Sequence, residues 1–195
     1  MKFIAALKQH KFYIAFSAIA FIIGLTLGLL VSPDEAKALT KSLSETLEPI
    51  AEYIRRNPLL GVLVILLKNW ATALLTFILG PFSPLIVAYN GWVIGVLGVH
   101  FKAQGKLLIY ILGIVPHGIV EIPALIVAGG AGLRFGRLLV VKLIARIKGS
   151  DYNVKAHIKP SLTLIVLSLI LFIIAAFIES LITPLIVGIV GGFLP

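Results

Sequence analysis

The sequence predicts an all-α fold, a polytopic transmembrane helical bundle with five to six spans, and three observations support this. Hydrophobic residues make up 59% of the chain and its mean hydropathy is +1.10, well above what the core of a soluble protein requires. Several apolar stretches are long enough, at about 1.5 Å per residue, to cross a hydrocarbon core of about 30 Å. Lysine and arginine collect between these stretches. We therefore expect a single transmembrane domain over residues 1–195, placed in the cell membrane.

The apolar stretches give the expected spans in order. They cover residues 12–31, 59–79, 85–101, 107–130 and 162–183. The first stretch is longer than the apolar region of a secretory signal peptide, so we interpret it as a retained span. Pro184 kinks or breaks the last apolar run, so that residues 184–195 form a re-entrant tail, a short sixth segment or a kinked continuation.

The segments between the spans predict two further helices. Residues 34–56 repeat aliphatic side chains every three or four positions, with acids early and Arg55 and Arg56 late, which is typical of an amphipathic helix. We expect this helix on the outer face. Residues 133–148 alternate bulky apolar side chains with basic ones, which favours a separate helix lying along the inner headgroups, in contact with anionic lipid.

The distribution of charge predicts the orientation. Lysines and arginines crowd the segment from Leu133 to Lys159, which has one acid, Asp151, and cytoplasmic loops carry such an excess. The N-terminus is then cytoplasmic and the protein is multi-pass. The net charge of +9 reflects orientation and lipid contact. Nucleic acid is not an expected partner, because binding it would require a basic face with interleaved aromatic residues on a soluble domain.

Three titratable residues inside the expected spans form the candidate site. His117 and Glu121 lie four residues apart in "PHGIVEIPALIVAGG", and Glu179 lies in "FIESLITP". The spacing of the first two places them on one face of a helix. A carboxylate in the bilayer interior costs a few kcal/mol, so such residues face the bundle and find partners. We expect the three side chains to converge, with the helix broken before Pro116 so that it starts at His117.

Other polar and small residues complete the predicted cluster. Asparagines within spans hydrogen-bond across helices, and a deep lysine either pairs with an acid such as Glu121 or Glu179 or lies in a wetter part of the bundle. The glycines of the third span, spaced four and three apart, allow close helix contact and a homodimer. The polar cluster we expect comprises His117, Glu121, Glu179, Asn69, Asn90 and Lys68, with Pro116, Gly118, Pro123 and Pro184 shaping the backbone and Gly91, Gly95 and Gly98 forming the small-residue face.

The motifs "LKNW", "NGWVIG", "PHGIVEIPALIVAGGAGLRFG" and "FIESLITP" together resemble the stage II sporulation protein M family of integral membrane proteins. The resemblance covers most of the chain after Asn57. It implies a multi-span helical protein. The sporulation member of the family is associated with a septal complex that remodels peptidoglycan during engulfment, beside separate wall-cutting enzymes. The family-motif positions are His117, Gly118, Glu121, Pro123, Asn69, Asn90 and Glu179.

Three functions are compatible with these residues. The first is a noncatalytic scaffold or assembly partner for other membrane proteins, in which polar residues hold helices in register. The second is a transporter or proton-coupled carrier that uses the trio His117, Glu121 and Glu179. The third is an intramembrane hydrolase in which the trio binds a divalent metal such as zinc, although the second histidine and separate base usual in such enzymes are not evident. The noncatalytic function is the one we favour, and no catalytic residue is assigned. The absence of cysteine excludes disulfides and thiolate ligands.

Overall fold

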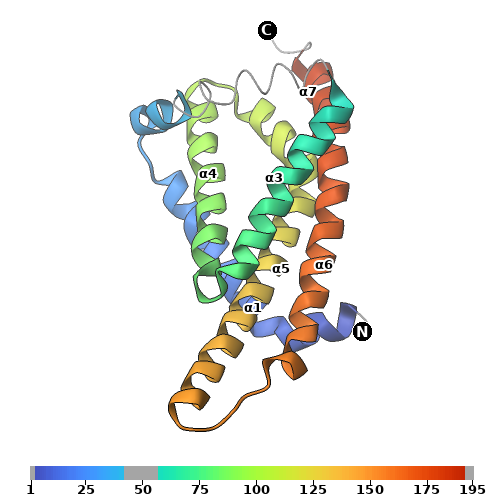
Figure 1. Ribbon diagram of the computed structural model, residues 1–195. Coiled ribbons are helices and arrows are strands. Elements are labelled where there is room, and N and C mark those ends of the chain that lie inside the picture. The colour runs from blue at the N-terminus through green and yellow to red at the C-terminus, as the bar shows by residue number, and fades with distance from the viewer. Residues whose placement is uncertain (1–2, 42–56, 192–195) are drawn as a thin grey trace.

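The computed structural model describes residues 3–41 and 57–191, and these are helical throughout apart from short turns (Figure 1). The helices are α1 (Phe3–Leu29), α3 (Pro58–Ile78), α4 (Ser83–Ala103), α5 (Leu107–Ile147), α6 (Val154–Phe177) and α7 (Thr183–Gly191). A 3₁₀ turn, Gly80–Phe82, joins α3 to α4, and a π-helical turn, Ile178–Ile182, joins α6 to α7. The predicted all-α fold is confirmed.

Five helical segments are long and apolar enough to cross a membrane, which confirms a multi-pass membrane protein. They are α1, α3, the 3₁₀ turn with α4, α5, and the continuous run Val154–Val190. Successive segments alternate in direction, so that the loop between α4 and α5 and the end of α7 lie at the upper end of Figure 1, opposite the turn between α3 and α4.

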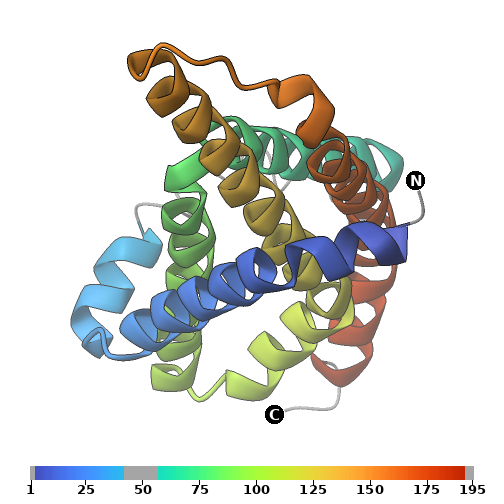
Figure 2. The same ribbon diagram turned by 90° about the horizontal axis from the view of Figure 1, so that it is seen from below.

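Close helix packing through glycine builds one seam of the bundle. Figure 2 shows α1 lying across α4 and α5. A Cβ added to Gly24 would lie 1.8 Å from the carbonyl oxygen of Ala88, and one added to Gly95 would lie 2.5 Å from that of Leu25. The small-residue face of α4 therefore packs inside this chain against α1, and this contact accounts for Gly91 and Gly95 without a second copy of the chain.

Side-chain hydrogen bonds tie the other helices together. Ser168 of α6 donates to the Ala124 carbonyl of α5 at 2.7 Å, and Ser83 of α4 donates to the Gly129 carbonyl at 3.0 Å. The indole of Trp70 donates to the Leu169 carbonyl at 3.0 Å, which joins α3 to α6. The apolar core runs between these contacts and includes the fully buried side chains of Val87, Leu164 and Ala124.

The structure corrects two of the predicted boundaries within α5. The helix does not break before Pro116, since α5 continues through Pro116 and Pro123. Residues 133–148 also do not form a separate helix, because residues 133–147 continue α5. The glycines near residue 130 look like a span end in sequence, yet they are packing positions: a Cβ on Gly130 would lie 2.9 Å from Ile14 Cα, and one on Gly136 would lie 2.3 Å from Pro81 Cδ.

Two other predicted segments differ at their ends. The first span begins at Phe3 rather than near residue 12, because the basic N-terminal residues join the same helix. Of the alternatives for the residues after Pro184, the described part of the chain shows a continuation of the last run: α6 leads through the π-helical turn into α7, which continues to Gly191, and residues 192–195 lie outside the described residues. Of the predicted outer helix, residues 34–41 are helical and the remainder lies outside the described residues.

Candidate functional site

The three titratable residues of the spans meet between α5 and the π-helical turn. One ligand atom from each of His117, Glu121 and Glu179 can be chosen so that all three lie within 4.8 Å of one another. His117 Nε2 is 3.7 Å from Glu121 Oε2, and the two side chains are 13% and 24% exposed. His117 lies ten residues into α5, or about 15 Å along its axis, which places the trio near the middle of a span.

The backbone of the last span places Glu179 in this position. Glu179 is the second residue of the π-helical turn Ile178–Ile182, which ends one residue before Thr183 and two before Pro184. Proline at position 184 cannot donate to a carbonyl four residues earlier, and a π-helical turn accommodates that loss. Turns of this kind are frequent at functional sites because they redirect one side chain.

Hydroxyl and amide groups surround the trio. The Oγ1 atom of Thr183 lies 3.4 Å from His117 Nδ1, and the Thr183 side chain is buried. Asn69 of α3 is buried beside the carboxyl group of Glu121, although its Nδ2 completes no hydrogen bond. Within the described part of the chain, Glu179 Oε2 is likewise buried without a hydrogen-bond partner. The cluster therefore contains donors and acceptors that are not matched to one another.

The remaining predicted members of the cluster behave differently. The Lys68 side chain is exposed and, among the described residues, it forms no ion pair with either glutamate. Asn90 donates at 2.8 Å to the Ile86 carbonyl of its own helix, so it does not join the trio.

The backbone residues predicted to shape the site fall into two groups. Pro116 and Pro123 lie inside continuous α5, so neither starts a half-helix. Gly118 is buried on the same helix, where a Cβ would lie 3.3 Å from Ile114 Cγ2. Pro184 follows the π-helical turn and is the proline that reshapes the backbone beside the trio.

A second polar cluster, which the sequence did not predict, lies near the opposite end of the bundle. His10 of α1 is fully buried, with Nε2 3.0 Å from Ser161 Oγ of α6 and Nδ1 2.8 Å from the Ala6 carbonyl. Arg134 of α5 lies 3.2 Å from His10 Nδ1. The cluster joins α1, α5 and α6. His10 was not among the predicted site residues, because the expected first span began at residue 12. A first span extended to Phe3 would have placed this histidine inside a span, where it needs a partner.

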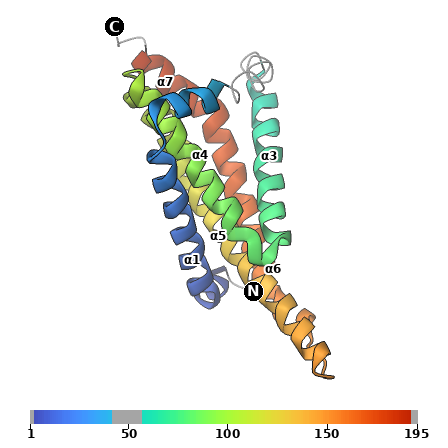
Figure 3. The ribbon, with the colours of Figure 1, turned by 90° about the vertical axis from the view of Figure 1, so that its left-hand side faces the viewer.

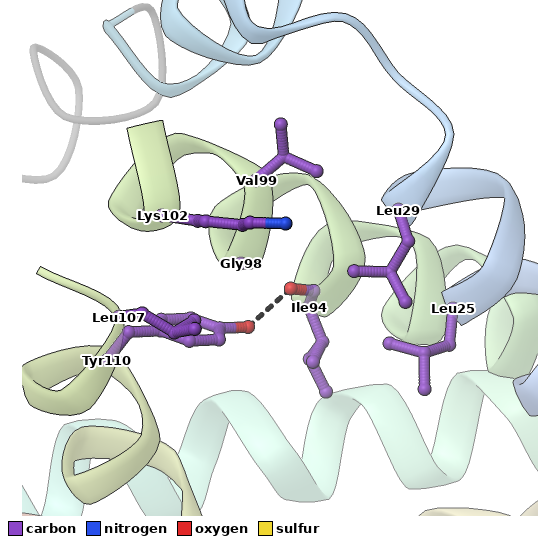
Figure 4. A pocket seen from close by; sticks show the side chains of 8 residues that line it. All are labelled: Leu25, Leu29, Ile94, Gly98, Val99, Lys102, Leu107 and Tyr110. Carbon is purple, nitrogen blue, oxygen red and sulfur yellow. Dashed lines mark hydrogen bonds between the residues drawn. The ribbon is translucent and has the colours of Figure 1, made fainter. Parts of the chain in front are cut away.

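A cavity of about 400 Å³ lies apart from both clusters (Figure 4). Leucine, isoleucine and valine side chains of α1, α4 and α5 line it, together with Lys102 and Tyr110. The Tyr110 hydroxyl donates to the Ile94 carbonyl across it. None of His117, Glu121 and Glu179 lines this cavity.

The fold and this intramembrane cluster define a polytopic helical membrane protein, and comparison with known proteins gives its family. Residues 17–184 match the model of the family "Stage II sporulation protein M", and the chain belongs to that family. The family resemblance predicted from the sequence motifs is therefore confirmed.

Two relatives come from the archaeon Methanocaldococcus jannaschii. The uncharacterized protein MJ0706 is 38% identical over 122 residues, which are 63% of this chain and 55% of that protein. The uncharacterized protein MJ0793 is 36% identical over 111 residues, which are 56% of this chain and 60% of that protein. The matches thus span little more than half of the length of these relatives. No solved structure matches the chain.

The chemistry available at the trio is limited to a small set. One imidazole and two carboxylates can hold protons, or they can offer one nitrogen and two oxygen ligands to a divalent cation. Two carboxylates this close in an apolar setting require compensation by protons or by a cation. The site is thus suited to an ion or to protons.

Proposed function

We propose that the protein is a noncatalytic membrane scaffold that holds a partner protein at the cytoplasmic face. The observation that carries this proposal is the end of α5, residues 137–147, which we name the α5 arm. Gly136 packs against the 3₁₀ turn between α3 and α4, so the arm extends past that turn (Figures 1 and 3). At about 1.5 Å per residue the arm is about 16 Å long.

The surface of the arm favours docking of a partner. Its exposed apolar side chains lie on one face at helical spacing, and they are Leu139, Val140, Leu143, Ile144 and Ile147. Basic residues flank this face on both sides, with Lys142 and Arg146 along one edge and Arg137 and Lys148 along the other. An exposed apolar stripe beyond the bundle marks an interaction surface, and basic edges favour an acidic partner.

A carrier or hydrolase has less support from the geometry. Either function needs a route by which a substrate reaches the titratable groups, and the cavity of about 400 Å³ does not include them. The scaffold function uses the rigid glycine seam and the arm and needs no such route. The cytoplasmic placement of the arm follows the positive-inside rule and belongs to the same proposal.

Site-specific photocrosslinking in the native membrane tests the proposal. A photoreactive residue at Leu143 should give one discrete protein adduct, whereas the same residue at Ile78, which is 67% exposed at the neighbouring end of α3, should give lipid adducts. The Leu143 adduct should be lost when Ile144→Glu places an acid on the apolar face. Lipid adducts alone at Leu143 would refute protein docking, and an adduct of twice the mass of the chain would identify a homo-oligomer instead.

A further inference from the structure

We propose that His117, Glu121 and Glu179 bind one divalent transition-metal ion, of the zinc class, that joins α5 to the π-helical turn of the last span. The proposal goes beyond the scaffold function and does not depend on it. Three ligand atoms of the types that zinc prefers already lie within 4.8 Å of one another. Two come from one turn of α5, at positions i and i+4, and the third comes from the π-helical turn of the last span.

The distances are close to those of a bound ion. Zinc–nitrogen and zinc–oxygen bonds of about 2.0–2.2 Å in tetrahedral geometry place neighbouring ligand atoms about 3.3–3.6 Å apart. His117 Nε2 and Glu121 Oε2 are 3.7 Å apart. The remaining adjustment falls on glutamate side chains, whose three torsions can rotate without movement of the backbone.

The neighbours of the trio are those that orient metal ligands. Metal-binding histidines usually donate their second ring N–H to a nearby oxygen, which fixes the tautomer. Thr183 Oγ1 lies 3.4 Å from His117 Nδ1, so a proton on Nδ1 points toward the threonine and the Nε2 lone pair is left for the ion. The unpaired amide of Asn69 lies beside Glu121, where it can hold the carboxylate oxygen that is not bound to metal.

The composition of the site also favours a cation. Two carboxyl groups meet one imidazole there, and Glu179 Oε2 is buried without a hydrogen-bond partner among the described residues. A divalent ion balances both carboxylates and gives Glu179 Oε2 a partner at the same time. Lys68 supplies one positive charge only, from an exposed side chain. Nitrogen and carboxylate ligands suit zinc, and three protein ligands leave one coordination position for water or another ligand.

Metal analysis of the purified chain tests this site. The protein is produced without a polyhistidine tag, purified in detergent without chelator, and its metals are measured by inductively coupled plasma mass spectrometry. After chelation and dialysis it is titrated with Zn²⁺ alone and, separately, with Co²⁺. We expect one equivalent of Zn²⁺ per chain, a rise in melting temperature on refilling, and the intense visible absorption of four- or five-coordinate Co²⁺.

Variants separate ligands from neighbours. Glu179→Gln should lose the bound equivalent, and Thr183→Val should weaken Zn²⁺ binding about 10–100-fold while the fold, followed by circular dichroism, is retained. Glu35→Gln, which removes an exposed carboxylate far from the trio, should bind like the wild type. If Glu179→Gln does not fold, the Co²⁺ spectrum of the wild type and the Thr183→Val affinity decide the question.

Two results would overturn the proposal. One is wild-type protein that takes up no Zn²⁺ and whose melting temperature does not respond to it, which would leave protons as the compensating charges. The other is equal Zn²⁺ content in the wild type, Glu179→Gln and Thr183→Val, which would indicate an adventitious ion only. Neither result bears on crosslinking at Leu143, so the scaffold function would be judged separately.

Discussion

The tight contact between α1 and α4 predicts a large effect of one methyl group. In Gly24→Ala the added Cβ would lie 1.8 Å from the Ala88 carbonyl oxygen and 2.6 Å from its carbonyl carbon, and both obstacles are backbone atoms. Ordinary contact begins at 3.4 Å, so the helices must separate locally by about 1.6 Å, the difference between 3.4 and 1.8 Å. The separation also opens the contact between Gly28 and Gly95 one turn away.

The net free energy of unfolding should fall by about 2 kcal/mol in this variant. Overpacking that backbone cannot relieve costs about 3 kcal/mol, at the upper end of its usual range. Replacing glycine by alanine within a helix returns about 1 kcal/mol. Gly113→Ala is the matched control, since nothing lies within 4 Å of a Cβ at this position of α5. That variant should gain about 0.5–1 kcal/mol.

Equilibrium unfolding in mixed micelles of mild detergent and dodecyl sulfate measures both changes against the wild type. The two substitutions add the same methyl group to helical glycines, so their difference isolates the seam. A Gly24→Ala variant as stable as the wild type, beside a stabilised Gly113→Ala variant, would refute the close approach of α1 and α4.

Two further predictions concern the two sides of the membrane. With a cytoplasmic N-terminus, Lys142→Cys should resist a membrane-impermeant thiol reagent in sealed, right-side-out cells and react after permeabilisation; labelling in sealed cells would overturn the orientation. At the other side, Ser32 and Glu35 cap the start of the helical residues 33–41. Glu35 Oε2 accepts hydrogen bonds from Ser32 Oγ at 2.7 Å and from the Ser32 amide at 3.1 Å, and the Glu35 amide donates back to Ser32 Oγ at 3.3 Å. The two hydrogen bonds to the carboxylate, that from Ser32 Oγ first, hold the pKa of Glu35 below its ordinary value of 4.5, so their stabilisation of the helix start is present above that pH and is lost as the pH falls through the lowered pKa. In Ser32→Ala an NMR titration should return the pKa of Glu35 toward 4.5, and an unchanged value would contradict the cap.

The sequence was sufficient for the spans and for the trio because both follow from the cost of polar groups in lipid. Glu121 and Glu179 are the acids that fall inside predicted spans, and that cost requires them to find partners. Their convergence with His117 in the structure agrees with this reasoning. The role of the trio remains a prediction, which the metal analysis addresses.

The helix boundaries and the partners of small residues could not be read in the same way. Proline inside a helix costs about 3 kcal/mol in water, yet packing maintains α5 through Pro116 and Pro123. A glycine stripe predicts a close helix contact but does not show which helix makes it. In the structure Gly95 of α4 packs against α1 of the same chain. Thr183 escaped notice because a hydroxyl inside a span is inexpensive and common, so only its distance from His117 reveals it.

The continuity of α5 relates the three features that we assign to it. The helix carries His117 and Glu121 in its first half, the close-packed Gly129 to Gly136 in its middle, and the α5 arm at its end. Since Gly130 and Gly136 fix its rotation against α1 and the 3₁₀ turn, the direction of the arm's apolar face is set by the same contacts that set the direction of His117. An ion held between His117, Glu121 and Glu179 would add a second fixed point, on the last span. A scaffold gains from this arrangement because a rigid arm loses less conformational entropy when a partner binds.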